Sequence, residues 1–171
     1  MRNMDRVFNP KNGTFGYRRA GDHSYSLTGV GVLAKLFWLG RPDHSVHEGL
    51  KNIESVDLNY SDKTCNLYTW YYDTQACYQA QEGAWSWWKD RFQGQLTGRQ
   101  SADGSWPPTG GTGEVGGGKD EPGKPLRNYA TSTTGDAPLY RTTLCCLMLE
   151  VFYRYLPTSQ ETSLGGGVQG L

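Results

Sequence analysis

An aspartate among aromatic residues is the group in this sequence best suited to acid–base chemistry. Asp73 lies three residues after Trp70 and four before Cys77, so a helix would place all three on one side, and Tyr71 and Tyr72 directly precede it. A carboxyl group in aromatic surroundings can have a raised pKa and donate a proton, and aromatic faces stabilise cations. Asp73 is therefore the candidate catalytic acid, with Trp70, Tyr71 and Tyr72 lining a pocket. The alternative is a structural hydrogen bond to a helix end or a neighbouring basic group.

Arg141 places a charge near the start of a mostly apolar segment, directly after Tyr140. A charged side chain is seldom buried unless it has a partner. Two roles are therefore open. Arg141 contacts a ligand, together with Tyr140, or it forms a structural ion pair with Asp73 or Glu150.

The other candidates for metal or phosphate chemistry lack part of the required pattern. His44 and His47 are three residues apart, but no cysteine or second carboxylate accompanies them at ligand spacing, so we expect exposed side chains and no metal site. The segment 113–119 has the spacing of a phosphate-binding loop, but Asp120 stands where Ser or Thr would ligate magnesium. No strand is expected before it, and Glu121-Pro122 interrupts the helix that would follow. No cofactor is expected.

Size and composition indicate one domain without a general affinity for polyanions. The 171 residues can bury a sizeable core, and 17 basic residues balance 17 acidic ones, so neither nucleic acid nor an anionic membrane is an expected partner. No stretch is long and apolar enough to predict a membrane span or an export signal. The four cysteines form no C-x-x-C pair, and the adjacent Cys145 and Cys146, within an apolar helix, are interpreted as small buried thiols. This slightly favours a cytoplasmic location.

Hydrophobic periodicity predicts two helices in the first third of the chain. The first is expected from about 26 to 39, and its broad apolar surface consists of Leu27, Val30, Leu33, Ala34 and Phe37. The second is short and begins after a cap at Asp43, and one face carries Val46, Leu50 and Ile53.

Three more helices are expected farther along the chain. They span about 66–79, 84–99 and 136–156. The helix over 84–99 has one apolar stripe, formed by Trp85, Trp88, Phe92 and Leu96, and a wet face elsewhere. The last begins at a cap from Asp136, has Pro138 in its first turn, and is apolar almost all round between 144 and 152, so we expect burial on most sides.

These helices alternate between more apolar and amphipathic ones, which predicts two layers: buried inner helices and outer helices that face water. The organisation expected is an N-terminal loop and turn segment over 1–24 and a helical domain over 25–157. The domain contains a long Gly/Pro-rich loop over 107–136, and a flexible tail follows over 158–171.

A turn rich in specific residues joins two of the expected helices. Gln100, Asp103, Gly104 and Trp106 are its characteristic residues, and we expect Asp103 to form the turn while Gln100 caps or bridges helix ends and Trp106 stacks against it. The stretch 12–15, Asn-Gly-Thr-Phe, echoes 103–106, Asp-Gly-Ser-Trp, and each precedes a helix with small residues near its start. Such internal similarity indicates a repeated helical pair.

These residues resemble the QW-type repeat of the prenyltransferase and squalene-cyclase superfamily. That repeat has an apolar residue, three others, Gln, a short gap and Gly-x-Trp; Leu96, Gln100, Gly104 and Trp106 match it, while Gln95 replaces the usual aromatic residue. The stretches 66–81 and 140–157 look like uncharacterised bacterial members. The resemblance covers about 13–157 and implies an all-α fold, an α/α toroid of alternating inner and outer helices joined by QW-type turns, here as a partial barrel or arc.

The resemblance implies two classes of function. The first is a binding or assembly module that holds an apolar small molecule or a protein partner on an aromatic-lined concave surface. The alternative is an enzyme of the terpene-cyclase or prenyltransferase type that uses Asp73, although the Asp-x-Asp-Asp motif of hopene cyclases is absent. The module is favoured, because cyclisation must exclude water and an arc encloses little. An open arc is expected to be closed by a second copy or by further N-terminal repeats.

Overall fold

Helices dominate the fold, which a computed structural model describes for residues 2–22, 24–40, 42–62, 65–109 and 135–154. The expectation of an all-α chain holds only in part, because a small two-stranded hairpin lies near the N-terminus. The phosphate-loop-like segment 113–119, most of the expected loop 107–136 and the tail 158–171 lie outside the described residues.

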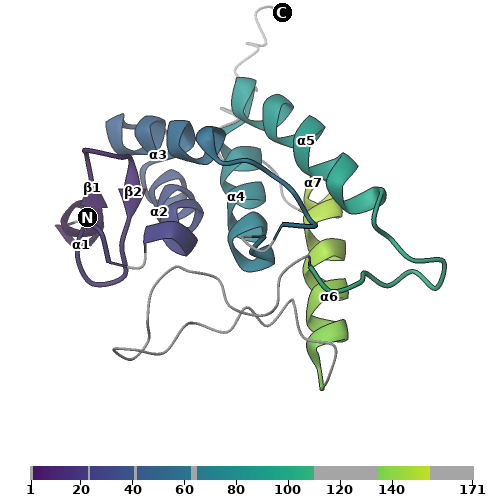
Figure 1. The fold of residues 1–171 in the computed structure, drawn as a ribbon. Coiled ribbons are helices and arrows are strands. Elements are labelled where there is room, and N and C mark those ends of the chain that lie inside the picture. Colours follow the sequence, from purple (N-terminus) through teal and green to yellow (C-terminus); the bar gives the residue numbers. More distant parts are fainter. Residues whose placement is uncertain (1, 23, 41, 63–64, 110–134, 155–171) are drawn as a thin grey trace, which may run out of the picture.

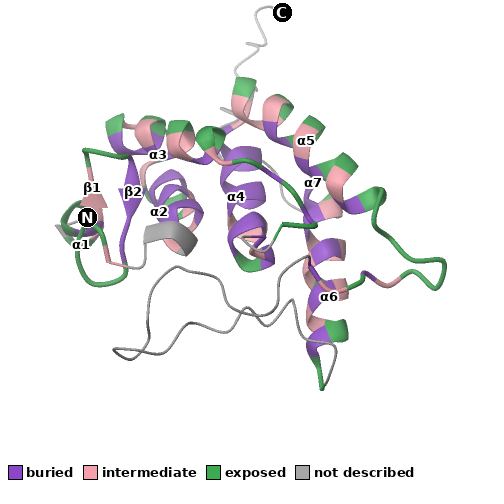
Figure 2. Cartoon of the chain, viewed as in Figure 1, coloured by how far each residue is buried: buried purple, intermediate pink, exposed green. Residues whose placement is uncertain are grey.

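The helices are arranged in two layers (Figure 1). One row contains α2 (Ser24–Leu39), α4 (Leu67–Ala80) and α6 (Ala137–Leu149), with α4 in contact with the other two. The helices α3 (His44–Ser55) and α5 (Glu82–Thr97) cover this row from one side. The inner helix α4 is buried along most of its length (Figure 2). The two expected layers are therefore present in the described residues, as an open row rather than a closed ring.

The N-terminal segment has more regular structure than the loop and turn expected over 1–24. Helix α1 (Arg2–Val7) leads into strand β1 (Phe8–Asn9), which pairs antiparallel with β2 (Thr14–Phe15) so that Phe8 lies opposite Phe15. The Phe15 ring is almost fully buried and packs against that of Phe8, with their centroids 5.1 Å apart. The hairpin therefore supplies an aromatic anchor to the core next to α2.

The buried face of α2 differs from the predicted one. Ala34 and Phe37, expected on the apolar surface, are exposed, and Leu27, Val30 and Leu33 are only half-buried. The buried positions are instead Thr28, Gly29, Gly31, Val32, Lys35 and Leu36. The reason is steric: the two glycines allow α4 and the Phe15 ring to approach the α2 backbone closely, which turns larger apolar side chains away from that contact.

Lys35, a charged residue inside this buried face, joins three elements. Its ammonium lies 2.6 Å from Asp5 of α1 and 3.1 Å from Asp43, which also caps α3 by accepting a hydrogen bond from the Val46 amide. Burial lowers the pKa of Lys35, but hydrogen bonds to both carboxylates more than offset this, so the net pKa is raised. Burial raises the pKa of Asp43, but hydrogen bonds from Ser45, Val46 and Lys35 bring it below its usual value.

These shifts give the Lys35 network a defined pH range. Its contribution to stability is present above the unfolded-state pKa of aspartate, about 4, and is lost as the pH falls through the lower folded pKa of Asp43. It is also present below the unfolded-state pKa of lysine, about 10.4, and is lost as the pH rises through the higher folded pKa of Lys35.

Asp5→Asn is expected to lower the free energy of unfolding by about 1 kcal/mol at pH 7, because it weakens a contact to a buried ammonium. Glu48→Gln is the matched control, since Glu48 pairs at 2.7 Å with a Lys51 side chain that is 69% exposed, and it should lower the free energy of unfolding less than Asp5→Asn does. Urea unfolding measures both; equal effects of the two variants would contradict the proposed importance of burial.

Helices α3, α4 and α5 form as their sequence signals predict. Asp43 caps α3, and the Asn66 side chain caps α4 by accepting from the amides of Tyr68 and Thr69. The α5 stripe is confirmed, since Trp88, Phe92 and Leu96 are each at most 2% exposed, while Trp85 is half-buried. Local signals and tertiary packing agree in this part of the chain.

The last expected helix is shorter and more exposed than predicted. Glu150 separates α6 from α7 (Val151–Arg154), and Asp136 occupies the position before α6 but makes no side-chain capping hydrogen bond. One stripe of α6 is buried, at Ala137, Arg141, Cys145 and Met148, whereas Leu139 is 67% exposed. Because α6 ends the inner row, α4 covers only one of its sides. None of the described helices is both long and apolar enough to cross a bilayer.

Candidate functional site

A cavity of about 400 Å³ lies where α3, the end of α4 and the start of α5 meet. Its volume falls within the range of small-molecule sites. The mainly apolar part of its wall consists of Pro42, Leu50, Cys77, Ala80, Ala84 and Trp87. The polar part consists of His47, Lys51, Glu54 and Gln81. An apolar body with a few polar contacts around it is the ligand that such a wall fits.

The helices position these side chains by simple periodicity. His47, Leu50, Lys51 and Glu54 recur at three- and four-residue intervals, so they form one face of α3. Trp87 is held on α5 by Arg91, whose guanidinium carbon lies 4.6 Å from the ring centroid. The Trp87 ring in the cavity wall is therefore held in place by a residue of the same helix, α5.

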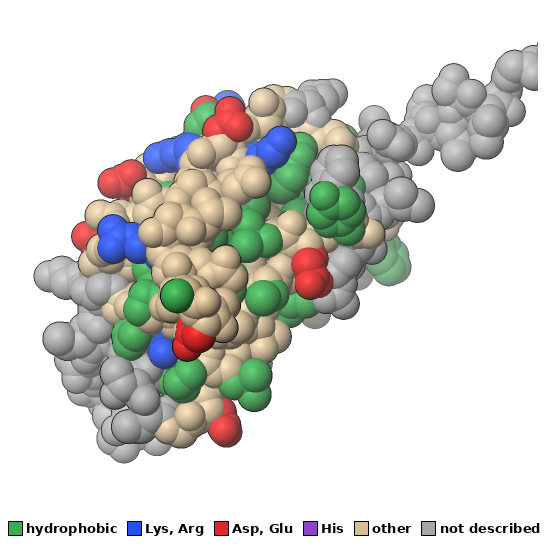
Figure 3. Space-filling model, turned by 90° about the vertical axis from the view of Figure 1, so that its right-hand side faces the viewer, with side chains coloured by type: hydrophobic (Ala, Val, Ile, Leu, Met, Phe, Trp, Pro, Cys, Tyr) green, Lys and Arg blue, Asp and Glu red, His purple; other side chains and the backbone are tan. Residues whose placement is uncertain are grey.

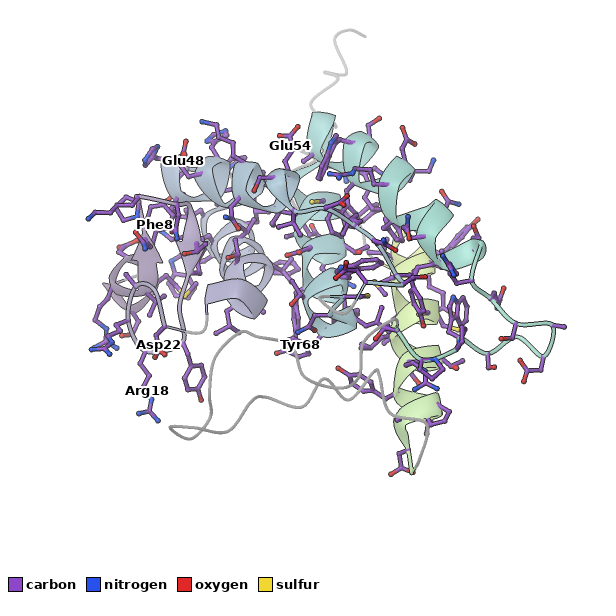
Figure 4. The ribbon with its side chains drawn as sticks, in the orientation of Figure 1. Phe8, Arg18, Asp22, Glu48, Glu54 and Tyr68 are labelled. Atoms are coloured by element: carbon purple, nitrogen blue, oxygen red, sulfur yellow. The ribbon has the colours of Figure 1, made fainter. Side chains whose placement is uncertain are left out.

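The charges on the cavity wall are not equivalent. The Lys51 ammonium is paired with Glu48 at 2.7 Å, and the His47 ring nitrogen Nδ1 lies 2.9 Å from the backbone oxygen of Asp43. Glu54 has no ion pair among the described residues. Its side chain lies at the end of α3 on the side of α5 (Figure 4).

Gln81 brings an unusual backbone to the cavity wall. It is the only non-glycine residue with positive φ among the described residues, at +54°, and it is at once the end of α4 and the start of α5. Its backbone N–H and its side-chain amide both donate to the Tyr78 carbonyl. Such a conformation costs about 1–3 kcal/mol and is found preferentially at functional sites.

A second, smaller cavity of about 250 Å³ lies between α5 and the α6–α7 segment. Its lining comprises Trp85, Lys89, Phe92, Gln93, Leu149 and Tyr153. On the face drawn in Figure 3, hydrophobic side chains are scattered among other side chains and backbone, with a few charged groups between them. Tyr153 is 86% exposed, so the wall of this cavity is open to solvent on that side, and its volume is also smaller than that of the first cavity.

Asp73, the predicted catalytic acid, lies on the α2 side of α4, and neither cavity includes it in its lining. It is 3% exposed, and its Oδ1 atom has no hydrogen-bond partner among the described residues. Burial raises the pKa of the Asp73 carboxyl well above its usual value, and the Gly29 backbone N–H offsets this only in part. The raised pKa therefore comes from packing against α2.

The aromatic residues predicted to surround Asp73 point in several directions around α4. Trp70 is 2% exposed in the hydrophobic core. Tyr72 packs edge-on against Tyr68 and Tyr71, with ring centroids 4.9 and 5.0 Å away. Tyr68 marks the first turn of α4 in Figure 4. Trp70, Tyr71 and Tyr72 are absent from the lining of both cavities, so these residues do not assemble there with Asp73.

Arg141 is buried and fastens α6 to the turn before it. Its Nε donates to the Trp106 carbonyl at 3.1 Å, and among the described residues no ion pair joins it to Asp73. Helix packing explains this, because Asp73 faces α2 while Arg141 lies on α6. Tyr140 is half-buried, which raises the pKa of its hydroxyl, and it lines neither cavity.

The turn over 100–106 has the predicted shape but a different role for its glutamine. Asp103 Oδ1 accepts from the amide and the hydroxyl of Ser105, and Gly104 has a φ of +84°. Gln100 donates to the Gly104 carbonyl at 3.0 Å, so it closes its own turn instead of joining helix ends. Trp106 is buried and its indole donates to the Leu96 carbonyl at 2.8 Å.

The N-terminal turn repeats this geometry, as the internal similarity predicts. Asn12 Oδ1 accepts from the amide and the hydroxyl of Thr14, at 3.3 and 2.7 Å, and Gly13 has a φ of +70°. The buried Phe15 occupies the place of Trp106. Each turn therefore inserts one aromatic side chain into the core ahead of an inner helix.

The sequence interpretation missed the residues of the larger cavity. The sequence pattern that could have revealed them is the i, i+3, i+7 spacing of His47, Leu50 and Glu54, which places them on one face of α3. Only an apolar face was assigned to this helix from the sequence. No three potential metal ligands come together within the described ranges.

Comparison with protein-family models, with curated proteins and with solved structures finds no significant match to this chain.

Proposed function

We propose that this chain is a helical binding module of the α/α-toroid type that holds a small, largely apolar ligand in the α3–α4–α5 cavity. The cavity carries this proposal: about 400 Å³ bounded by Trp87, Leu50, Ala80 and Ala84, with strained Gln81 on its wall. The relation to the prenyltransferase and squalene-cyclase superfamily is part of the proposal. The two-layer arrangement and the two equivalent turns support it.

Filling the cavity tests the binding function. Ala84→Trp places an indole in the space, and it should abolish the fluorescence enhancement of the neutral apolar dye N-phenyl-1-naphthylamine that the native chain produces. Ala34→Trp is the control, because Ala34 is exposed on α2 and lines neither cavity. A native chain that binds no dye would refute the binding function, and so would equal dye binding by the two variants. Circular dichroism verifies that both variants are folded.

An assembly role for the same module is supported by the side of α6 that no other described element covers. Leu139 is 67% exposed, and Leu144, Leu147 and Leu149 are half-buried. A neighbouring helix from a second copy or from further repeats would extend the inner row there. A solution mass equal to a single chain at high protein concentration would exclude closure by a second copy.

An enzyme that uses Asp73 as an acid is the second candidate. A buried carboxyl with a raised pKa and an unpartnered oxygen favours it. The positions of Trp70, Tyr71 and Tyr72 weigh against it, because these residues line neither of the two cavities described above. Isoprenoid turnover by the native chain that disappears in Asp73→Asn would support the enzyme and displace the binding module.

A further inference from the structure

We infer that the α3–α4–α5 cavity selects a small amphipathic amine, with its ammonium group beside Glu54 and its apolar body against Trp87. This inference rests on the proposed binding function and names the chemical class of its ligand. It follows from the distribution of charge on the wall, from the position of the Glu54 carboxylate and from the Trp87 side chain that lines the same cavity.

Charge on the wall is biased toward one unpaired anion. Lys51 is neutralised by Glu48 at 2.7 Å, and His47 Nδ1 is engaged by the Asp43 carbonyl at 2.9 Å. Glu54 has no such partner among the described residues, although its backbone carbonyl accepts from Arg91 at 3.2 Å. A ligand that enters the cavity therefore meets one available carboxylate.

Glu54 is solvent-exposed on the wall of the cavity, and its charge also affects the α4 side of that wall. The buried Cys77 thiol is part of the wall contributed by α4, and its pKa is raised first by burial and then by the negative charges of Asp73 and Glu54. The negative potential of Glu54 thus reaches the α4 wall. A cation placed between these helices would be stabilised by the same potential.

Trp87 supplies the apolar contact for the rest of the ligand. Arg91 stacks on this ring and lies 3.6 Å from Asp57, but it is absent from the cavity lining. Leu50, Ala80 and Ala84 complete an apolar surface around the ring. A cavity of about 400 Å³ falls within the range of small-molecule sites, which suits a ligand such as an arylalkylamine.

A matched pair of probes tests the inference. 2-Phenylethylamine and 2-phenylethanol have nearly the same shape but differ in charge at pH 7. We expect the amine to bind the native chain about five- to tenfold more tightly by isothermal titration calorimetry, which corresponds to about 1–1.4 kcal/mol. Glu54→Gln should bring the amine to the affinity of the alcohol and leave the alcohol unchanged. Asp90→Asn, an exposed carboxylate on α5 outside the cavity lining, should change neither.

The possible results distinguish a failure of amine selectivity from a failure of ligand binding in the α3–α4–α5 cavity. Equal binding of amine and alcohol, both lost in Ala84→Trp, would overturn the amine selectivity and leave the binding module intact. Binding of neither probe, together with no binding of the apolar dye, would refute both. Binding of lysine blocked at both its amino and carboxyl ends, without binding of the free amine, would overturn the small-molecule assignment in favour of a lysine side chain of a peptide.

Discussion

Replacing Gly29 with alanine is expected to lower the free energy of unfolding by about 3 kcal/mol or more, a large part of the stability of a domain of this size. A Cβ atom at position 29 would lie 2.3 Å from Asp73 Oδ1, 2.7 Å from the Asp73 backbone nitrogen and 2.8 Å from the Tyr72 carbonyl carbon. Two of these atoms belong to the backbone of α4, so no rotamer change relieves the contact. The α2–α4 pair must move apart, and this pair forms the main contact of the inner row.

Gly94→Ala is the matched control for this effect. Gly94 lies inside α5 with open space where its Cβ would be placed, so alanine should stabilise the chain by about 0.5–1 kcal/mol through helix propensity alone. Urea unfolding followed by circular dichroism measures both variants. A Gly29→Ala chain that unfolds within 0.5 kcal/mol of the native protein would show that α2 and α4 are not in close backbone contact.

Local signals predicted much of the fold because they act within one turn of a helix. Asp43 caps its helix with the expected side-chain hydrogen bond, and Asp103 forms the expected turn. The α5 stripe also follows directly from the spacing of large apolar residues along one helix. Each of these features is decided by residues that are near one another in the sequence.

Features decided by tertiary contact were not predictable from the same patterns. The buried face of α2 is set by Gly29 and Gly31, which have no apolar side chain to register in a periodicity. Lys35 is buried because Asp5 and Asp43 come from other elements to meet it. The cavity likewise needs α3, α4 and α5 together. The sequence interpretation of Asp73 identified an unusual carboxyl but assigned its burial to the aromatic residues beside it instead of to α2.

Asp73→Asn is expected to stabilise the protein, increasingly so as the pH rises from about 4. The pKa of Asp73 is raised well above its usual value by burial, so the folded state holds a proton that the unfolded state releases above about pH 4. Native stability therefore falls with rising pH by up to about 1.4 kcal/mol per unit until the pH reaches the folded pKa. The asparagine side chain does not titrate, so the free energy of unfolding of the variant does not fall with rising pH for this reason.

The difference between Asp73→Asn and the native chain isolates this single group from the Lys35 network, whose contribution from Asp43 changes in the opposite direction below about pH 4. Unfolding free energies measured at pH 4.5, 6 and 7.5 should show a gap that widens with pH until the folded pKa of Asp73 is reached, and Asp90→Asn on the exposed side of α5 is the control variant. An Asp73→Asn chain less stable than the native protein at pH 7.5 would mean that the charged carboxylate supports the fold. A more stable one would show a buried acid kept at a cost to stability, the property that makes Asp73 worth testing for turnover.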